Sequence, residues 1–144
     1  MPQPAGTSIN LSRLLLAGAL AGAVYVAGGV AVGHALFGAE MIENLHRLGV
    51  PPPSGADAVR HVALRLLAGL VTTFVYVLAL PRLGRGWRTA FAAALATWLA
   101  AYPVFLFALV DLGVLAPLTA LLAGAWGLVE GFLAALAGAR AYRE

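Results

Sequence analysis

The chain has 144 residues, of which 62% are apolar and only 10% are charged, and its mean hydropathy is +0.91. Soluble domains are about 45–50% apolar and about 25% charged, so this composition predicts a single domain, residues 1–144, that resides in a membrane. The net charge of +3 comes from arginines at the ends of apolar runs, which excludes nucleic acid as the expected partner, and the lack of cysteine excludes thiol chemistry.

Four apolar runs are long enough to cross the hydrocarbon layer of a bilayer, which takes about 20 residues. We expect spans at roughly 14–37, 59–80, 89–110 and 118–139. The first run is longer than the apolar region of a signal peptide, about 7–15 residues, and is therefore expected to be a span. The sequence thus predicts an all-α membrane protein, a four-transmembrane-helix bundle.

The connection between the first two spans is the only long one. Within it, apolar residues recur at helical spacing: Met41, Ile42, Leu45 and Leu48. Polar residues take the other side, which predicts a short amphipathic helix in the outer headgroup layer. The prolines at 51–53 predict a stiff extended spacer. Ser54 and Asp57 have capping-box spacing and predict the start of the second helix.

The positions of the arginines predict the orientation. Arginines precede the first span, crowd the loop between the second and third spans, and follow the fourth: Arg13, Arg82, Arg85, Arg88, Arg140 and Arg143. Loops rich in arginine stay on the cytoplasmic side. Both termini are therefore expected in the cytoplasm, with the protein integral to a bacterial inner membrane.

A polar stripe follows one face of the second span. Asp57, His61 and Arg65 are spaced four residues apart, and such residues stack on one helix face. The same stripe continues with hydroxyl-bearing residues: Thr72, Thr73 and Tyr76. An arginine about two turns inside the membrane boundary should face protein rather than lipid.

The fourth span carries one carboxylate, Glu130, within the run GAWGLVEGFLAALAG. A lone acid at bilayer depth is costly and marks a candidate functional site. Counting a rise of about 1.5 Å per residue places Arg65 in an outer layer with Tyr102, and Glu130 in a deeper layer with Trp98 and the threonines of the stripe. The two charges should then lie about 10 Å apart along the membrane normal, too far for a direct ion pair without tilting or water.

Two interpretations of this intramembrane site remain open. In the structural one, threonine and tyrosine hydroxyls bind a protonated Glu130 and fix the register of the helices, because a neutral acid costs far less to bury than a charged one. In the functional one, Glu130 is a proton or cation site that is reached along the stripe. The protein would then be a small carrier or channel for protons, cations or a small solute.

Glycines at small-residue spacing predict close helix packing. They lie on the first and fourth spans: Gly18, Gly22, Gly29, Gly33, Gly127 and Gly131. In lipid, helices associate through close backbone approach at such positions. We expect packing inside one chain, with an oligomer interface as the alternative.

Polar residues also gather on the outer side of the predicted bundle: His34, Glu43, His46, Asp57, His61 and Asp111. His34 and His61 at matching depth on antiparallel helices could bind a b-type haem between them. With the neighbouring acids and His46, a divalent metal site is also conceivable.

Motifs of hydrolases, metalloproteases and phosphate-binding loops are lacking in the sequence, so an enzyme is not expected. The sequence favours a structural or accessory subunit, which associates with itself or with a larger membrane complex. A carrier that uses the stripe and Glu130 is the alternative, and haem or metal binding is a further one.

Overall fold

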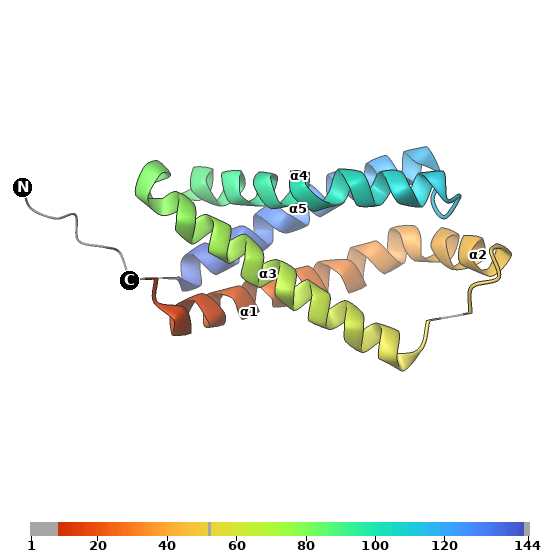
Figure 1. The fold of residues 1–144 in the computed structure, drawn as a ribbon, viewed down its shortest axis with the longest axis horizontal. Helices are drawn as coiled ribbons and strands as arrows, with labels where there is room; N and C mark the ends of the chain where they lie inside the picture. Colours follow the sequence, from red (N-terminus) through yellow and green to blue (C-terminus); the bar gives the residue numbers. More distant parts are fainter. Residues whose placement is uncertain (1–8, 52, 143–144) are drawn as a thin grey trace, which may run out of the picture.

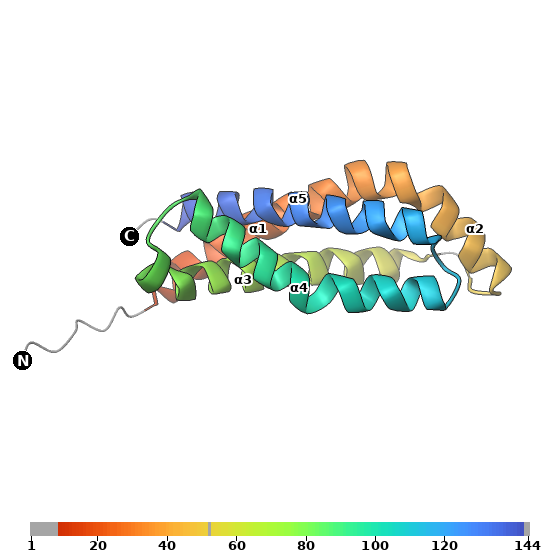
Figure 2. The ribbon, with the colours of Figure 1, turned by 90° about the horizontal axis from the view of Figure 1, so that it is seen from above.

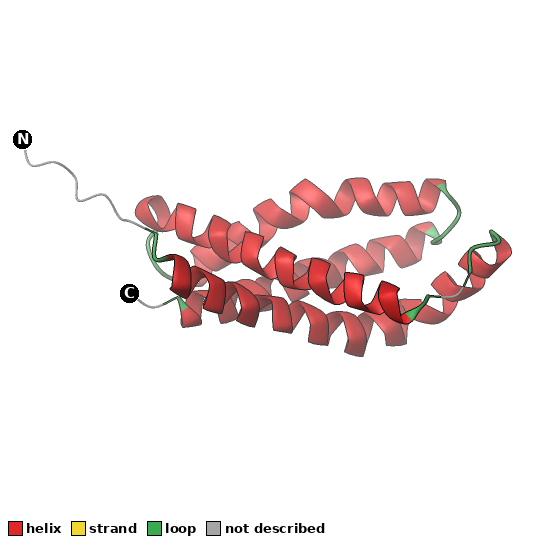
Figure 3. Cartoon of the chain, turned by 60° about the horizontal axis from the view of Figure 1, so that its bottom comes forward, coloured by secondary structure: helices red, strands yellow, loops and turns green. Residues whose placement is uncertain are grey.

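The computed structural model describes residues 9–51 and 53–142, and its regular elements there are all helical. In chain order they are α1 (Leu11–Gly28), the π-helix η1 (Gly29–Gly38), α2 (Ala39–Arg47), α3 (Gly55–Leu83), α4 (Trp87–Asp111) and α5 (Pro117–Ala141). Short loops at the two ends of the bundle join the helices (Figure 3). Pro52 of the expected spacer and Arg143 of the charge pattern lie outside the described residues.

Four helical stretches in the described part of the chain are long and apolar enough to cross a membrane: Leu11–Arg47, Gly55–Leu83, Trp87–Asp111 and Pro117–Ala141. The all-α fold and the number of long apolar helices are therefore confirmed. Each helix is longer than the expected span, because the amphipathic turns at its ends continue the same hydrogen-bonded backbone.

The bundle has two distinct ends (Figures 1 and 2). What we call the α2 end holds α2, the start of α3 and the turn between α4 and α5. The opposite end holds the start of α1, the turn between α3 and α4, and the end of α5. In Figure 1, α3 runs diagonally across α1 instead of lying parallel to it.

The first span and the expected amphipathic helix form one continuous helical run from Leu11 to Arg47. We expected the span to end at residue 37 and the amphipathic helix to be separate from it, and this is wrong: Gly38 between them has helical φ and ψ of −64° and −40°. A glycine does not end a helix by itself, and unpaired backbone groups are costly in an apolar setting. The ten residues of η1 are π-helical, although π-helices mostly occur as single turns.

The closest approach between helices is the crossing of α1 and α3. A Cβ atom on Gly69 of α3 would overlap the backbone of Gly22, and a Cβ on Gly22 would lie 2.6 Å from the Leu66 Cα. A Cβ on Gly18 would lie 2.8 Å from the Leu70 Cα. The spacing Gly18-x-x-x-Gly22 thus lets two backbones of the same chain touch.

The other glycines selected from the sequence have different neighbours. A Cβ on Gly127 would overlap the Tyr102 ring, and one on Gly131 would lie 3.0 Å from the Tyr25 hydroxyl oxygen, so both make room for aromatic side chains. A Cβ on Gly33 would meet no neighbouring atom within 4 Å. Only part of the glycine pattern therefore serves direct helix contact.

The larger part of the buried core lies in the half of the bundle away from α2. The main core cluster consists of small and aromatic residues of this half: Leu14, Ala17, Tyr76, Val77, Ala90, Ala93, Ala94, Ala135 and Tyr142. From residue 55 to 67 of α3 and from 95 to 111 of α4 no residue is buried, and Figure 1 shows these two stretches diverging toward the α2 end. Their apolar side chains, such as Val59 and Val104, are exposed and suited to lipid or to a partner.

Candidate functional site

The candidate site is a buried ion pair between α3 and α5. Glu130 of α5 is 2% exposed, and the side chain of Arg65 on α3 is 20% exposed. Arg65 Nη1 lies 2.7 Å from each of the two carboxylate oxygens of Glu130. Charge-assisted hydrogen bonds of this length are among the stronger polar contacts in proteins.

The expectation that Arg65 and Glu130 occupy separate layers is therefore wrong. That expectation counted residues along upright helices, whereas α3 crosses the bundle diagonally (Figure 1). A long arginine side chain also carries its charged end well away from its own backbone. The tilt of α3 and the length of the Arg65 side chain together bring the two charges into contact, although the count of residues placed them in separate layers.

Arg65 makes two further hydrogen bonds. Its Nη1 donates to the backbone carbonyl of Tyr25 at 2.9 Å, and its Nε donates to His61 Nε2 at 3.2 Å. Tyr25 lies near the end of α1, and His61 lies one turn before Arg65 on α3. One guanidinium thus joins α1, α3 and α5 at a single point.

Bare backbone covers the ion pair where α1 continues into η1. A Cβ on Gly28 would overlap Glu130 Oε1, and a Cβ on Gly29 would lie 2.6 Å from the Arg65 Cζ. Gly29 was selected from the sequence for helix packing, whereas Gly28 was missed. Two adjacent glycines within an apolar span were the available signal, because such a pair leaves room for a bulky neighbour.

A cluster of hydroxyl groups lies beside the pair. The Tyr25 hydroxyl and Thr72 Oγ1 are 3.2 Å apart, and Thr72 donates to Thr97 Oγ1 at 3.4 Å. Thr97 in turn donates to the carbonyls of Ala93 and Ala94 on its own helix. Thr72 therefore bonds a tyrosine and a threonine. Thr97 is a member of the site that the sequence pattern did not reveal.

The other two residues of the stripe lie deeper in the core. Thr73 is fully buried, and its Oγ1 is among the buried polar atoms that have no hydrogen-bond partner in the described structure. A Cβ on Gly138 would approach this oxygen closely. Tyr76 is 3% exposed and belongs to the main core cluster.

Aromatic residues hold α4 against α5 on the side of Glu130. Trp98 Nε1 donates to the carbonyl of Gly124 at 2.9 Å. The Trp98 and Tyr102 rings stack with centroids 6.3 Å apart and an interplanar angle of 14°. Tyr102 fills the space that Gly127 leaves open. Both aromatic residues selected from the sequence thus pack on the helix that carries Glu130.

The polar residues of the outer cluster are not gathered into one site. Asp57 accepts hydrogen bonds at 2.7 Å from the Ser54 N–H and hydroxyl, which forms the expected capping box, and it also pairs with Arg60. His61 uses its Nε2 to accept from Arg65, so this nitrogen is occupied. His34 lies against Gly38 of its own helix.

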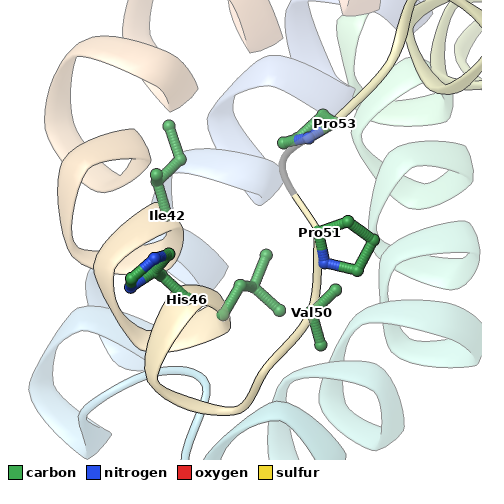
Figure 4. Close-up of a pocket in the computed structure, with 6 residues that line it drawn as sticks. Ile42, His46, Val50, Pro51 and Pro53 are labelled. Carbon is green, nitrogen blue, oxygen red and sulfur yellow. The ribbon is translucent and has the colours of Figure 1, made fainter.

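In the described residues, no group of three or more His, Asp or Glu side chains lies close enough to hold a metal ion. Glu43, His46 and Asp111 are exposed. His46 lines a cavity of about 80 Å³ between α2 and the linker that follows it (Figure 4), together with Ile42, Leu45, Val50, Pro51 and Pro53. This cavity has room for two or three waters by volume.

No family model, curated protein or solved structure matches the chain. The contacts around Arg65 and Glu130 are therefore the main support for a function.

Removing one member of the ion pair should destabilise the fold strongly. We expect Glu130→Gln to lower the free energy of unfolding by about 3–5 kcal/mol, because Arg65 then stays buried without a counter-charge. The double variant Arg65→Met with Glu130→Gln should recover most of this loss, since it buries no unpaired charge. Reversible unfolding in mixed detergent micelles measures both.

The matched control for this experiment is Arg60→Met. Arg60 pairs with Asp57 at the surface, where the two side chains are 73% and 39% exposed, so its loss should change stability little. Equal stability of Glu130→Gln and the parent chain would contradict the ion pair as a stabilising contact.

Proposed function

We propose that the chain is an integral protein of a bacterial inner membrane, and that it acts as a structural or accessory subunit. The observation that carries this proposal is the direct contact between Arg65 and Glu130. Glu130 and Arg65 neutralise each other inside the chain, and Arg65 donates its other hydrogen bonds to the Tyr25 carbonyl and to His61. Such a set of contacts suits a pair that fixes helix register. The Glu130 carboxylate is then occupied by its own chain instead of being left for a ligand.

Self-association would use the surface that the chain leaves uncovered. The closest backbone contacts, at Gly22 and Gly69, are made within one chain. The diverging halves of α3 and α4 carry large exposed side chains, with Leu64 at 65% and Val104 at 74% exposure. In a membrane, helices associate through van der Waals packing, and the diverging halves of α3 and α4 leave a surface on which another helix can pack. We propose that these halves contact a second copy or a larger membrane complex.

Self-association is tested with two copies of the chain that carry different tags. We expect the tags to purify together in mild detergent, and the native mass to be a multiple of 14.8 kDa. Leu64→Trp and Val104→Trp should weaken this association by disturbing the packed surface, while Leu121→Trp, at an equally exposed position of α5, should not. A single-chain mass in both detergent and nanodiscs would reject self-association.

The distribution of arginines supports an orientation. Arg82, Arg85 and Arg88 lie around the α3–α4 turn, at the same end as the start of α1 and the end of α5. Positive charge of this kind stays in the cytoplasm. We therefore propose cytoplasmic termini, with the α2 end outside and α2 in the outer headgroup layer. Met41 and Ile42 of α2 are partly exposed apolar residues that suit this position.

Cysteine labelling checks the orientation, because the chain has no native cysteine. The variant Gly55→Cys, at an exposed position of the α2 end, should react with a membrane-impermeant maleimide in intact cells. The variant Leu83→Cys, at an exposed position of the opposite end, should react only after permeabilisation. The opposite pattern would reverse the proposed topology.

One observation favours a second candidate, a small carrier of protons or cations. Hydrogen-bonding groups continue from His61 through Arg65 to Glu130 and the backbone of Tyr25. The Tyr25 side chain begins a second series that continues through Thr72 to Thr97. Such a series of polar groups within apolar helices is typical of proton pathways.

The carrier predicts pH-coupled flux in proteoliposomes. Glu130→Gln should abolish this flux and remove an infrared carboxyl band that titrates in the parent chain, while Arg60→Met should retain both. Identical infrared difference spectra of the parent and Glu130→Gln from about pH 5 to 9, around the range in which perturbed carboxyls titrate, would rule out the carrier.

A further inference from the structure

The helix α5 begins at a residue that cannot cap it. Its N-cap is Ala116, which makes no side-chain capping bond, although the first N–H groups of a helix need acceptors. The acceptor comes from α2 at the same end of the bundle: Glu40 Oε1 accepts from the Ala116 N–H at 2.8 Å, and Oε2 accepts from the Thr119 hydroxyl at 2.6 Å. A carboxylate here also meets the positive end of the α5 dipole. Glu40 thus caps a helix that begins far along the chain.

Asn44, one turn further along the same helical run, adds a second tie. It is 7% exposed, and its Nδ2 donates to the carbonyl of Val114 at 3.0 Å. Its side-chain oxygen accepts from Arg47, which fixes the amide orientation. Leu45 packs against Val114 and Leu115 in a small apolar cluster. Polar and apolar contacts therefore hold α2 to the α4–α5 turn.

The segment η1 lies between these α2 contacts and the ion pair, and it packs little against the rest of the bundle. None of the residues of η1 is buried. Apart from its chain neighbours α1 and α2, the described element that η1 contacts is α5. Its two ends are fixed: Gly28 and Gly29 lie on the ion pair, and Glu40 binds the start of α5. We call η1 the strap, because these contacts hold both of its ends in place.

We propose that α2 is a latch that holds η1 against α5, next to the Arg65–Glu130 pair. The junction of α1 and η1 lies directly on the pair, because a Cβ on Gly28 would overlap Glu130 Oε1. When Glu40 and Asn44 release the α4–α5 turn, η1 is free to pivot about this junction. The pivot moves η1 away from α5 and opens the space beside the ion pair from the α2 end, while the α1–α3 crossing stays in place.

Spin labels at Leu36→Cys on η1 and Leu121→Cys on α5 test the latch in lipid nanodiscs. Both positions are well exposed, at 66% and 69%. We expect one narrow distance distribution in the parent chain. The combined change Glu40→Ala and Asn44→Ala should add a second population at a longer distance, outside the width of the parent distribution. Glu43→Ala removes an exposed carboxylate of the same helix and should leave the distribution unchanged.

A second label pair, Leu15→Cys and Val71→Cys, reports on the α1–α3 crossing in the same variants. This distance should stay constant, because the crossing depends on glycine contacts outside the latch. An unchanged η1–α5 distance without Glu40 and Asn44 would overturn the proposal. A change in both label pairs would overturn it as well, because the two residues would then stabilise the whole bundle.

Discussion

A lone carboxylate or guanidinium is costly in an apolar interior, and at bilayer depth the cost is several kcal/mol. In this chain the direct contact between Glu130 and Arg65 offsets the cost of burying each charge. The contact requires that α3 and α5 keep one register and that α3 is tilted. It also requires a junction of α1 and η1 without side chains, which Gly28 and Gly29 provide. The arrangement of three helices in the middle of the bundle follows from this one pair.

The bundle is uneven because its side chains differ in size along its length. In the half away from α2, glycine and alanine let backbones approach, as at Gly22 and Gly69, and small residues fill the core. Toward the α2 end, α4 carries larger apolar side chains, and α3 and α4 diverge. Close packing supplies attraction between apolar helices where lipid and protein are equally apolar. The divergent half is therefore the natural place for lipid or a partner chain.

Polar contacts hold the α2 end together where apolar packing is sparse. Glu40 and Asn44 join α2 to the α4–α5 turn, while Arg65 and Glu130 join the helices in the middle. The strap η1 connects these two polar clusters along one helical run. In the proposed latch, a movement at Glu40 and Asn44 reaches the Arg65–Glu130 pair through η1 and leaves the main core cluster in place.

The four long apolar helices could be predicted from the sequence, because span length and hydropathy are local properties that do not depend on neighbouring helices. The sequence also predicted the capping box at Ser54, and it identified Glu130 and Arg65 as the residues that an apolar helix cannot leave unsatisfied. Three contacts became visible in the folded chain alone: the two charges meet, Gly28 covers them, and Glu40 caps α5. Each of these contacts depends on helix tilt and on side-chain reach between residues far apart in the chain, and neither follows from a count of residues along one helix.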